Sequence, residues 1–553
     1  MADDSRPPAG GAPPAAPARA TPPDLPPGLF LPHRQKIFIV SAIMLSLFLA
    51  ALDSTIMSVA MPRVVSDLGG LDLFAWPFTS YLLASTVIVP VVGKLSDVYG
   101  RKPFLLAGIA VFLLGSVLAG LSESMTALIG FRMVQGLGAG FIMANVFATL
   151  GDLFSPAERG RWVGAVSGTF ALASVIGPLV GGALTDELSW RWVFYINVPV
   201  ALVALPVVAI WMPWFRSPRK TRIDYLGGAA VIAAGVPLLL GFSWAGNQYA
   251  WTDARVVICF LLAAAFIALF VWAERRAGDW AVLPLALFRN RVFLVSSLVT
   301  ITLGFAMFGA IQFMPLFLQG AQGVSATNSG TVTMPMMIGI VVGSVAAGQF
   351  LSRGLGLRPL ALAGGALMVV GPLLISTLDV DSSRLLTRGY MVVMGLGVGV
   401  GLPLYGLAIQ NALPHRLLGV GTASTQFFRQ IGGSVGVAIL GSLMASGFSR
   451  ELGRAFPDGF ETLKQRPQTL LDPEALERFR ASVEATDPGT ADAVIETARG
   501  ALAGTLTELF LIGAGVMALA LVIAAFLPSV RARTSAELVR DAGEPGGPDS
   551  PSE

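Results

Sequence analysis

Residues 37–60 read IFIVSAIMLSLFLAALDSTIMSVA, and Asp53 is the only charged residue among them. A helix advances about 1.5 Å per residue, so roughly 20 apolar residues cross the hydrocarbon core of a bilayer. This stretch therefore predicts a membrane-spanning helix. Because a charge inside the membrane is costly, its single carboxyl group is a candidate functional residue.

Thirteen further stretches of comparable length and polarity follow along the chain. We therefore predict an all-α polytopic membrane protein with fourteen transmembrane helices. The predicted spans lie near residues 37–60, 74–92, 104–121, 125–149, 162–184, 193–214, 224–243, 254–273, 293–318, 327–351, 359–378, 385–409, 419–446 and 504–527.

The composition agrees with this fold class and argues against several functions. The 553-residue chain is 54% hydrophobic and 13% charged, with a mean hydropathy of +0.71, whereas soluble domains carry about 25% charged residues. A net charge of +3 without a clustered basic face gives no support for nucleic-acid binding. With one cysteine and two histidines, a zinc or haem site is not expected. We expect no metal, no cofactor and no enzyme activity.

The charges between the predicted spans are distributed unevenly. Connections on one side carry arginine and lysine, as in 94–102, 216–222 and 275–291, whereas the opposite short loops carry mainly acids, such as Asp67 and Glu123. Basic loops stay in the cytoplasm. We therefore predict a protein of the cytoplasmic membrane with both termini inside the cell. Nine of the ten tryptophans lie near predicted helix ends, as expected for membrane interfaces.

The chain divides into regions by composition. A long loop, predicted to be exterior, interrupts the second bundle; it is either a small helical subdomain that begins near Asp472 or a solvated flexible loop. The predicted regions are a disordered cytoplasmic tail (1–36), a six-helix bundle (37–216), an inserted helix pair (217–276), a linker at the membrane interface (277–292), a second six-helix bundle (293–528) containing the exterior loop (447–503), and a cytoplasmic tail (529–553).

The connection after the second span carries the most specific motif. Residues 93–103 read GKLSDVYGRKP, which resembles the G-x-L-x-D-x-x-G-R-K/R loop of the major facilitator superfamily. The resemblance implies a gate that holds the cytoplasmic side shut. In that gate Asp97 faces a helix N-terminus of the other half and Arg101 pairs with Asp152. The predicted gate residues are Gly93, Asp97, Gly100, Arg101, Lys102 and Asp152.

Three further motifs narrow the resemblance. Residues 52–62 read LDSTIMSVAMP, residues 190–199 read WRWVFYINVP, and the fifth span contains Gly177, Pro178, Gly181 and Gly182. The first two resemble motifs of the fourteen-helix drug:proton antiporters of the EmrB/QacA type, and the third resembles the exporter motif of the superfamily. Small residues four apart also let helices pack closely. The resemblance implies two six-helix bundles, an inserted pair and outward transport.

Asp53 and Arg132 are the candidate proton-coupling residues. Each lies about two turns from the predicted outer end of its span, so both are roughly 10 Å below that surface and can meet if their helices are neighbours. We expect substrate and proton to compete at the Asp53 carboxylate. A purely structural ion pair is the alternative.

The predicted substrate chamber contains polar and apolar side chains. Methionine adapts to varied ligands, although a stripe of methionine and phenylalanine is often simply core. The candidates are Gln135, Met307, Phe308, Gln312, Met336, Gln426, Arg429 and Gln430.

The sequence leaves several functions open. The leading hypothesis is a proton-coupled antiporter that exports lipophilic small molecules or drugs by alternating access. An exporter of lipids or of an endogenous metabolite is a second hypothesis, and a sensor that keeps a transporter fold without transport is a third. The expected partners are the substrate, protons and the bilayer. We expect a monomer, and an adaptor or lipoprotein partner stays open, as does the choice between H⁺ and Na⁺.

Overall fold

The structure is a computed structural model. It describes residues 28–69, 73, 76–214, 224–246, 249–324, 326–353, 355–413, 417–456, 470, 473–486 and 489–528. Most of the first predicted tail and all of the last one lie outside these residues.

Long helices dominate the described residues. Each of the fourteen predicted spans corresponds to a helix, with α6 and α7 together forming one of them. The helices are α1 (His33–Leu68), α2 (Trp76–Tyr99), α3 (Arg101–Gly120), α4 (Met125–Leu153), α5 (Pro156–Glu187), α6 (Trp192–Tyr195), α7 (Asn197–Trp211), α8 (Tyr225–Trp244), α9 (Ala254–Ala277), α10 (Arg291–Leu316), α11 (Ala326–Ser352), α12 (Leu357–Ile375), α13 (Arg384–Ala412), α14 (Leu418–Ala455), α16 (Pro473–Thr486) and α17 (Ala491–Ala525).

The helices fit a multi-pass membrane protein. Thirteen candidate spans within the described residues are long and apolar enough to cross a bilayer. The predicted span at 162–184 forms part of α5 but is not one of these thirteen. Trp190 departs from the predicted interfacial belt, because its ring is 1% exposed and its Nε1 donates to Asp67 at 2.9 Å.

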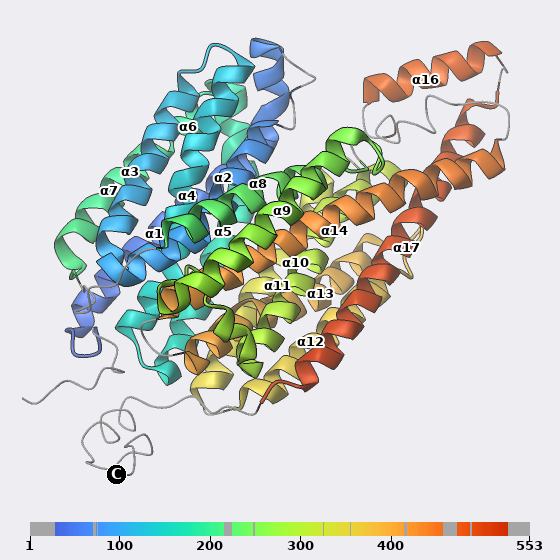
Figure 1. The fold of residues 1–553 in the computed structure, drawn as a ribbon. Coiled ribbons are helices and arrows are strands. Elements are labelled where there is room, and N and C mark those ends of the chain that lie inside the picture. Colours follow the sequence, from blue (N-terminus) through green and yellow to red (C-terminus); the bar gives the residue numbers. More distant parts are fainter. Residues whose placement is uncertain are drawn as a thin grey trace, which may run out of the picture.

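The helices form two groups. Helices α1–α7 pack against one another, and so do α10–α14 together with α17. Helices α8 and α9 pair with each other, and α8 contacts both α2 and α14. The inserted pair thus lies along the seam between the groups. The two groups meet near the lower centre of Figure 1 and separate towards its top.

Glycine permits the closest helix crossings. A Cβ on Gly138 would lie 2.2 Å from the backbone nitrogen of Phe112, where α4 crosses α3. A Cβ on Gly348 would lie 2.2 Å from the carbonyl oxygen of Gly160, where α11 of the second group crosses α5 of the first. These positions require hydrogen as the side chain, as in other tightly packed membrane helices.

The predicted exterior loop is largely helical. Helix α14 continues to Ala455 and α17 begins at Ala491, so both enter the range 447–503 that was predicted as a loop. Helix α16 lies between them, and buried Val483, Ala491 and Val494 form a small apolar cluster there. Hydropathy marks where a helix can leave the membrane, not where it ends. For the described residues the helical alternative is therefore the better description.

The linker between α9 and α10 packs partly against protein. The side chains of Val282, Leu283 and Leu287 are buried, and the two leucines pack with Phe293 from α10, whereas Trp280 is exposed. The Glu274 carboxylate at the end of α9 accepts hydrogen bonds from the linker's backbone. The predicted position of this linker at the membrane interface stays a prediction.

Candidate functional site

Asp53 lies at the centre of a buried polar network. Its carboxylate forms an ion pair with Arg132 of α4, and neither side chain is exposed to solvent. The amide Nε2 of Gln135 donates to the other carboxylate oxygen of Asp53 at 2.7 Å, and Arg132 Nη1 donates to Gln135 Oε1 at 2.8 Å. Three side chains from two helices thus form a closed set of hydrogen bonds.

Helical spacing and one glycine bring this network together. Arg132 and Gln135 are three residues apart, so they share a face of α4. Gly136 lets α2 approach, since a Cβ there would lie 2.4 Å from the carbonyl oxygen of Tyr81. The Tyr81 ring then covers the Arg132 guanidinium at 4.3 Å, and its hydroxyl donates to the carbonyl oxygen of Ala50 at 3.2 Å. A cation over an aromatic face is stabilised.

Sequence reasoning missed the second side of the network. Asn197, at the start of α7, donates to Ser116 Oγ at 3.0 Å, and its Nδ2 lies 3.4 Å from Asp53 Oδ1. Both Asn197 and Ser116 are fully buried. A signal was present, because Asn197 is the only uncharged amide side chain of the motif at 190–199 and precedes an apolar stretch. Asp53 therefore joins α1 to both α4 and α7.

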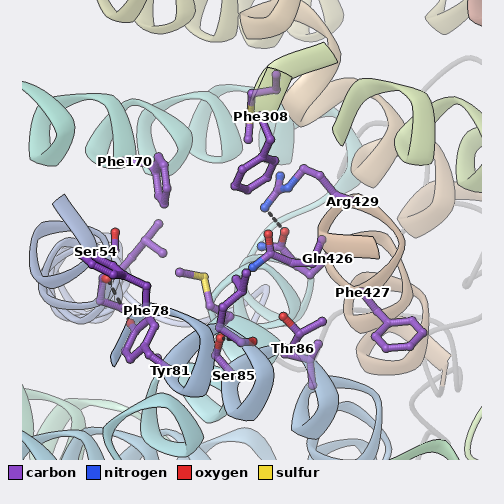
Figure 2. A pocket seen from close by; sticks show the side chains of 18 of the residues that line it. Ser54, Phe78, Tyr81, Ser85, Thr86, Phe170, Phe308, Gln426, Phe427 and Arg429 are labelled. Atoms are coloured by element: carbon purple, nitrogen blue, oxygen red, sulfur yellow. Dashed lines mark hydrogen bonds between the residues drawn. The ribbon is translucent and has the colours of Figure 1, made fainter. Parts of the chain in front are cut away.

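A central cavity of about 330 Å³ lies beside this network. Figure 2 shows residues of its walls, which come from both helix groups. Arg132 lines the cavity, whereas Asp53 is not among its described lining residues. A substrate in this cavity therefore meets the guanidinium before the carboxylate. This arrangement changes the expected mechanism, in which substrate and proton compete directly at Asp53.

Five of the predicted chamber residues line the central cavity: Met307, Phe308, Gln426, Arg429 and Gln430. Gln312 lines a second cavity of about 240 Å³, which shares Phe308 and Gln430 with the first and is partly walled by α8.

Two predicted chamber residues lie elsewhere. Gln135 belongs to the Asp53 network. Met336 is buried in the apolar core, and its carbonyl oxygen would lie 2.1 Å from a Cβ on Gly395, where α11 crosses α13. Residue type alone did not reveal which face of α11 turns towards the neighbouring helix.

The predicted gate residues lie together at one end of the molecule. Asp97 accepts hydrogen bonds from the backbone nitrogens of Gly419 and Val420, at 2.9 and 3.0 Å, in the first turn of α14. It also forms an ion pair with Arg101, whose Nε donates to Asp152 at 3.1 Å. The α14 N-terminus favours negative charge. The carboxylate of the first helix group is therefore fixed to the second group.

Glycines and a lysine complete this gate. A Cβ on Gly93 would lie 2.5 Å from that of Ala423, so α2 and α14 are in close contact. Gly100 has φ +94, a conformation that L side chains rarely adopt. Lys102 Nζ donates to the carbonyl oxygen of Ala209 in α7 at 2.6 Å. The Gly93–Ala423 contact and the α5–α11 crossing thus join the two helix groups at this end.

The motif in α5 packs against α1 near Asp53. A Cβ on Gly177 would lie 2.0 Å from Thr55 Oγ1, and one on Gly181 would lie 3.1 Å from Ile56 Cγ2. Gly182 is half-buried, and the Pro178 side chain lies outside the described residues. The glycines let α5 support the helix that carries Asp53.

Comparisons with known proteins agree with this fold. The family model of the Major Facilitator Superfamily matches residues 43–437. The chain is 40% identical to the multidrug transporter protein MdtP of Bacillus subtilis, over 74% of this chain and 75% of that protein. It is 34% identical to multidrug resistance protein 3 of the same organism, over 91% and 98%. The solved structure of the proton:xylose symporter XylE superposes with a TM-score of 0.58 at 12% identity, covering 91% of this chain and 98% of that chain.

Proposed function

Because the chain belongs to the major facilitator superfamily, we propose that it exports lipophilic small molecules across the cytoplasmic membrane in exchange for protons. It is a multi-pass membrane transporter, not an enzyme, and its relatives include proteins named as multidrug transporters. We propose the outward direction of transport, its coupling to protons and the alternation of access between the two helix groups.

One observation carries the proposal: a fully buried Asp53–Arg132 ion pair beside a cavity walled by both helix groups. Burying an ion pair costs desolvation free energy. Ionisable groups inside membranes commonly serve transport. We therefore assign the exchanged proton to Asp53, the carboxylate of this pair.

Arg132 links protonation of Asp53 to the binding of substrate in the cavity. Protonation of Asp53 removes the ion pair that joins α1 to α4 and leaves Arg132, which lines the cavity, without its counter-ion. The cavity wall and the packing of α1 then change together. In this mechanism the proton acts on the substrate through Arg132, and the gate around Asp97 and Arg101 opens and closes in the alternation.

Dye efflux from everted membrane vesicles tests the proposal. We expect vesicles that contain the chain to take up lipophilic dyes when respiration energises them, and an uncoupler to collapse the uptake. If a sodium ionophore collapses uptake and the uncoupler does not, the coupling ion is Na⁺ and not H⁺. Vesicles that take up no dye in a panel of anionic, neutral and cationic probes would favour the sensor hypothesis.

A further inference from the structure

The charged side chains that line the central cavity are hydrogen-bond donors. Its described walls contain two guanidinium groups, those of Arg132 and Arg429, and no carboxylate. Arg132 is ion-paired with Asp53 behind the wall. Arg429 hydrogen-bonds to Gln426 Oε1, and no described carboxylate pairs with it. A buried cation without a counter-ion is costly, so this charge is suited to a ligand that supplies one.

Neighbouring groups add further donors. Within the described part of the chain, the Nε2 of Gln426, a residue 5% exposed, has no hydrogen-bond partner, and neither has Nη2 of Arg132. The bond from Arg429 occupies Gln426 Oε1, so the amide presents its donor side to the remaining space. Figure 2 shows Gln426 and Arg429 together at the pocket. Buried donors without partners call for an acceptor.

The rest of the wall is mainly apolar. Rings from both helix groups border the cavity, those of Phe78, Phe170 and Phe308 among them, and Met143 and Met307 add flexible thioether side chains. Aromatic and methionine side chains accommodate bulky apolar bodies of varied shape. The cavity thus combines an apolar volume with a cationic, donor-rich site at Arg429 and Gln426.

We propose that the central cavity selects amphiphilic organic anions, with the anionic group held by Arg429 and Gln426 and the apolar body packed among the phenylalanines. The proposal rests on the proposed function only in taking this cavity as the place where the exported molecule binds. A guanidinium binds carboxylate, sulfonate or phosphate groups through charge-assisted hydrogen bonds.

Pyrenebutanoate and pyrenylbutyl-trimethylammonium test the proposal, because they share an apolar body and linker and differ in the charged group, which is a hydrogen-bond-accepting carboxylate in one and a cation in the other. Binding to the full chain in zwitterionic nanodiscs is measured by equilibrium dialysis, with empty nanodiscs subtracted. We expect the anion to bind at least about tenfold more tightly, the difference typical of a hydrogen-bonded charge. Equal binding, or preference for the cation, in the wild-type protein would overturn the proposal.

Variants locate the preference. Arg429→Gln should weaken pyrenebutanoate binding about tenfold or more and leave pyrenylbutyl-trimethylammonium binding no weaker, whereas Arg429→Lys should keep the anion preference. Gln426→Leu should weaken the anion alone, to a smaller extent. The control is Arg454→Gln, an exposed arginine of the same helix that pairs with Glu451. An anion preference that survives in Arg429→Gln would contradict the proposed site.

The two proposals can fail separately. An anion preference that depends on Arg429, in a protein that transports nothing in vesicles, would support this inference and reject export. Proton-driven efflux of cations that is unaffected by Arg429→Gln would support export and reject this inference.

Discussion

The Asp53 carboxylate is held in place by donors from two helices. Gln135 and Arg132 approach from α4 and Asn197 from α7, and all of these side chains are buried. The position of the carboxylate is therefore set by neutral neighbours as well as by the arginine.

Gln135→Ala tests this point. Loss of the 2.7 Å hydrogen bond to Asp53 leaves the carboxylate and its paired arginine less firmly positioned. We expect dye uptake into everted vesicles to fall about tenfold, the worth of one charge-assisted hydrogen bond. Asn145→Ala is the control, because Asn145 is also buried in α4 but donates to the carbonyl oxygen of Phe141. A fall of the same size in both variants would reject a specific role of Gln135.

Part of this network could be predicted from sequence. A lone acid and a lone arginine, each deep in an apolar segment, have to find polar partners, and Gln135 follows from the spacing on α4. Asn197 and Tyr81 could not be placed in the same way. Their contacts depend on the break between α6 and α7 and on the approach of α2 at Gly136, which are tertiary features.

At the scale of helices, two of the contacts that join the two groups at the gate can be tested. One is the crossing of α5 and α11 at Gly160 and Gly348, where backbones touch. The other is Asp97 on the first turn of α14. Both can be probed through Thr425, which is 7% exposed and lies between the gate and the central cavity. A cysteine introduced at position 425 should react faster with a maleimide when the gate opens.

Gly348→Ala should favour the open gate. The added methyl group would lie 2.2 Å from the Gly160 carbonyl oxygen, so α5 and α11 must separate. In a Cys259→Ser, Thr425→Cys background, we expect an impermeant maleimide to label everted vesicles several-fold faster. Gly504→Ala is the control, because a Cβ at Gly504 has nothing within 4 Å. Unchanged labelling with Gly348→Ala would show that this crossing does not hold the gate.

Asp97→Asn should open the gate by a different route. The neutral amide loses the ion pair with Arg101 and the attraction of the α14 N-terminus. Because charge-assisted hydrogen bonds are roughly twice as strong as neutral ones, we expect labelling at position 425 to increase by about tenfold. Asp492→Asn is the control, because Asp492 is exposed, pairs with Arg480 and lies far from Asp97 in the sequence. Equal labelling rates in Asp97→Asn and the wild-type protein would show that Asp97 does not hold the gate closed.

The helices themselves were predictable, but several of their ends were not. Each of the fourteen spans predicted from hydropathy corresponds to a helix, because a membrane requires long apolar runs. It placed the end of the first span at residue 60, whereas α1 continues to Leu68, and it missed the extensions of α14 and α17. Polar residues can continue a helix beyond the apolar run, and hydropathy does not detect them.

At the scale of the whole molecule, a seam between two helix groups contains the central cavity. The groups are joined at the gate and diverge away from it (Figure 1). The sequence predicted two bundles and an inserted pair through resemblance. Which residues face the cavity could not be read from one chain: Arg132, not Asp53, borders it, and Met336 does not, because helix rotation is set by neighbours that meet only in the folded protein.

The central claim is that Asp53 couples a proton gradient to transport. Proteoliposomes that contain the full chain, with an imposed pH gradient and the dye that vesicles extrude best, test it most directly. The wild-type protein should move this dye against its concentration gradient. We predict that Asp53→Asn abolishes this uphill movement but retains exchange of dye at equal concentrations, since the cavity is intact. Uphill transport by Asp53→Asn at the wild-type rate would contradict the account.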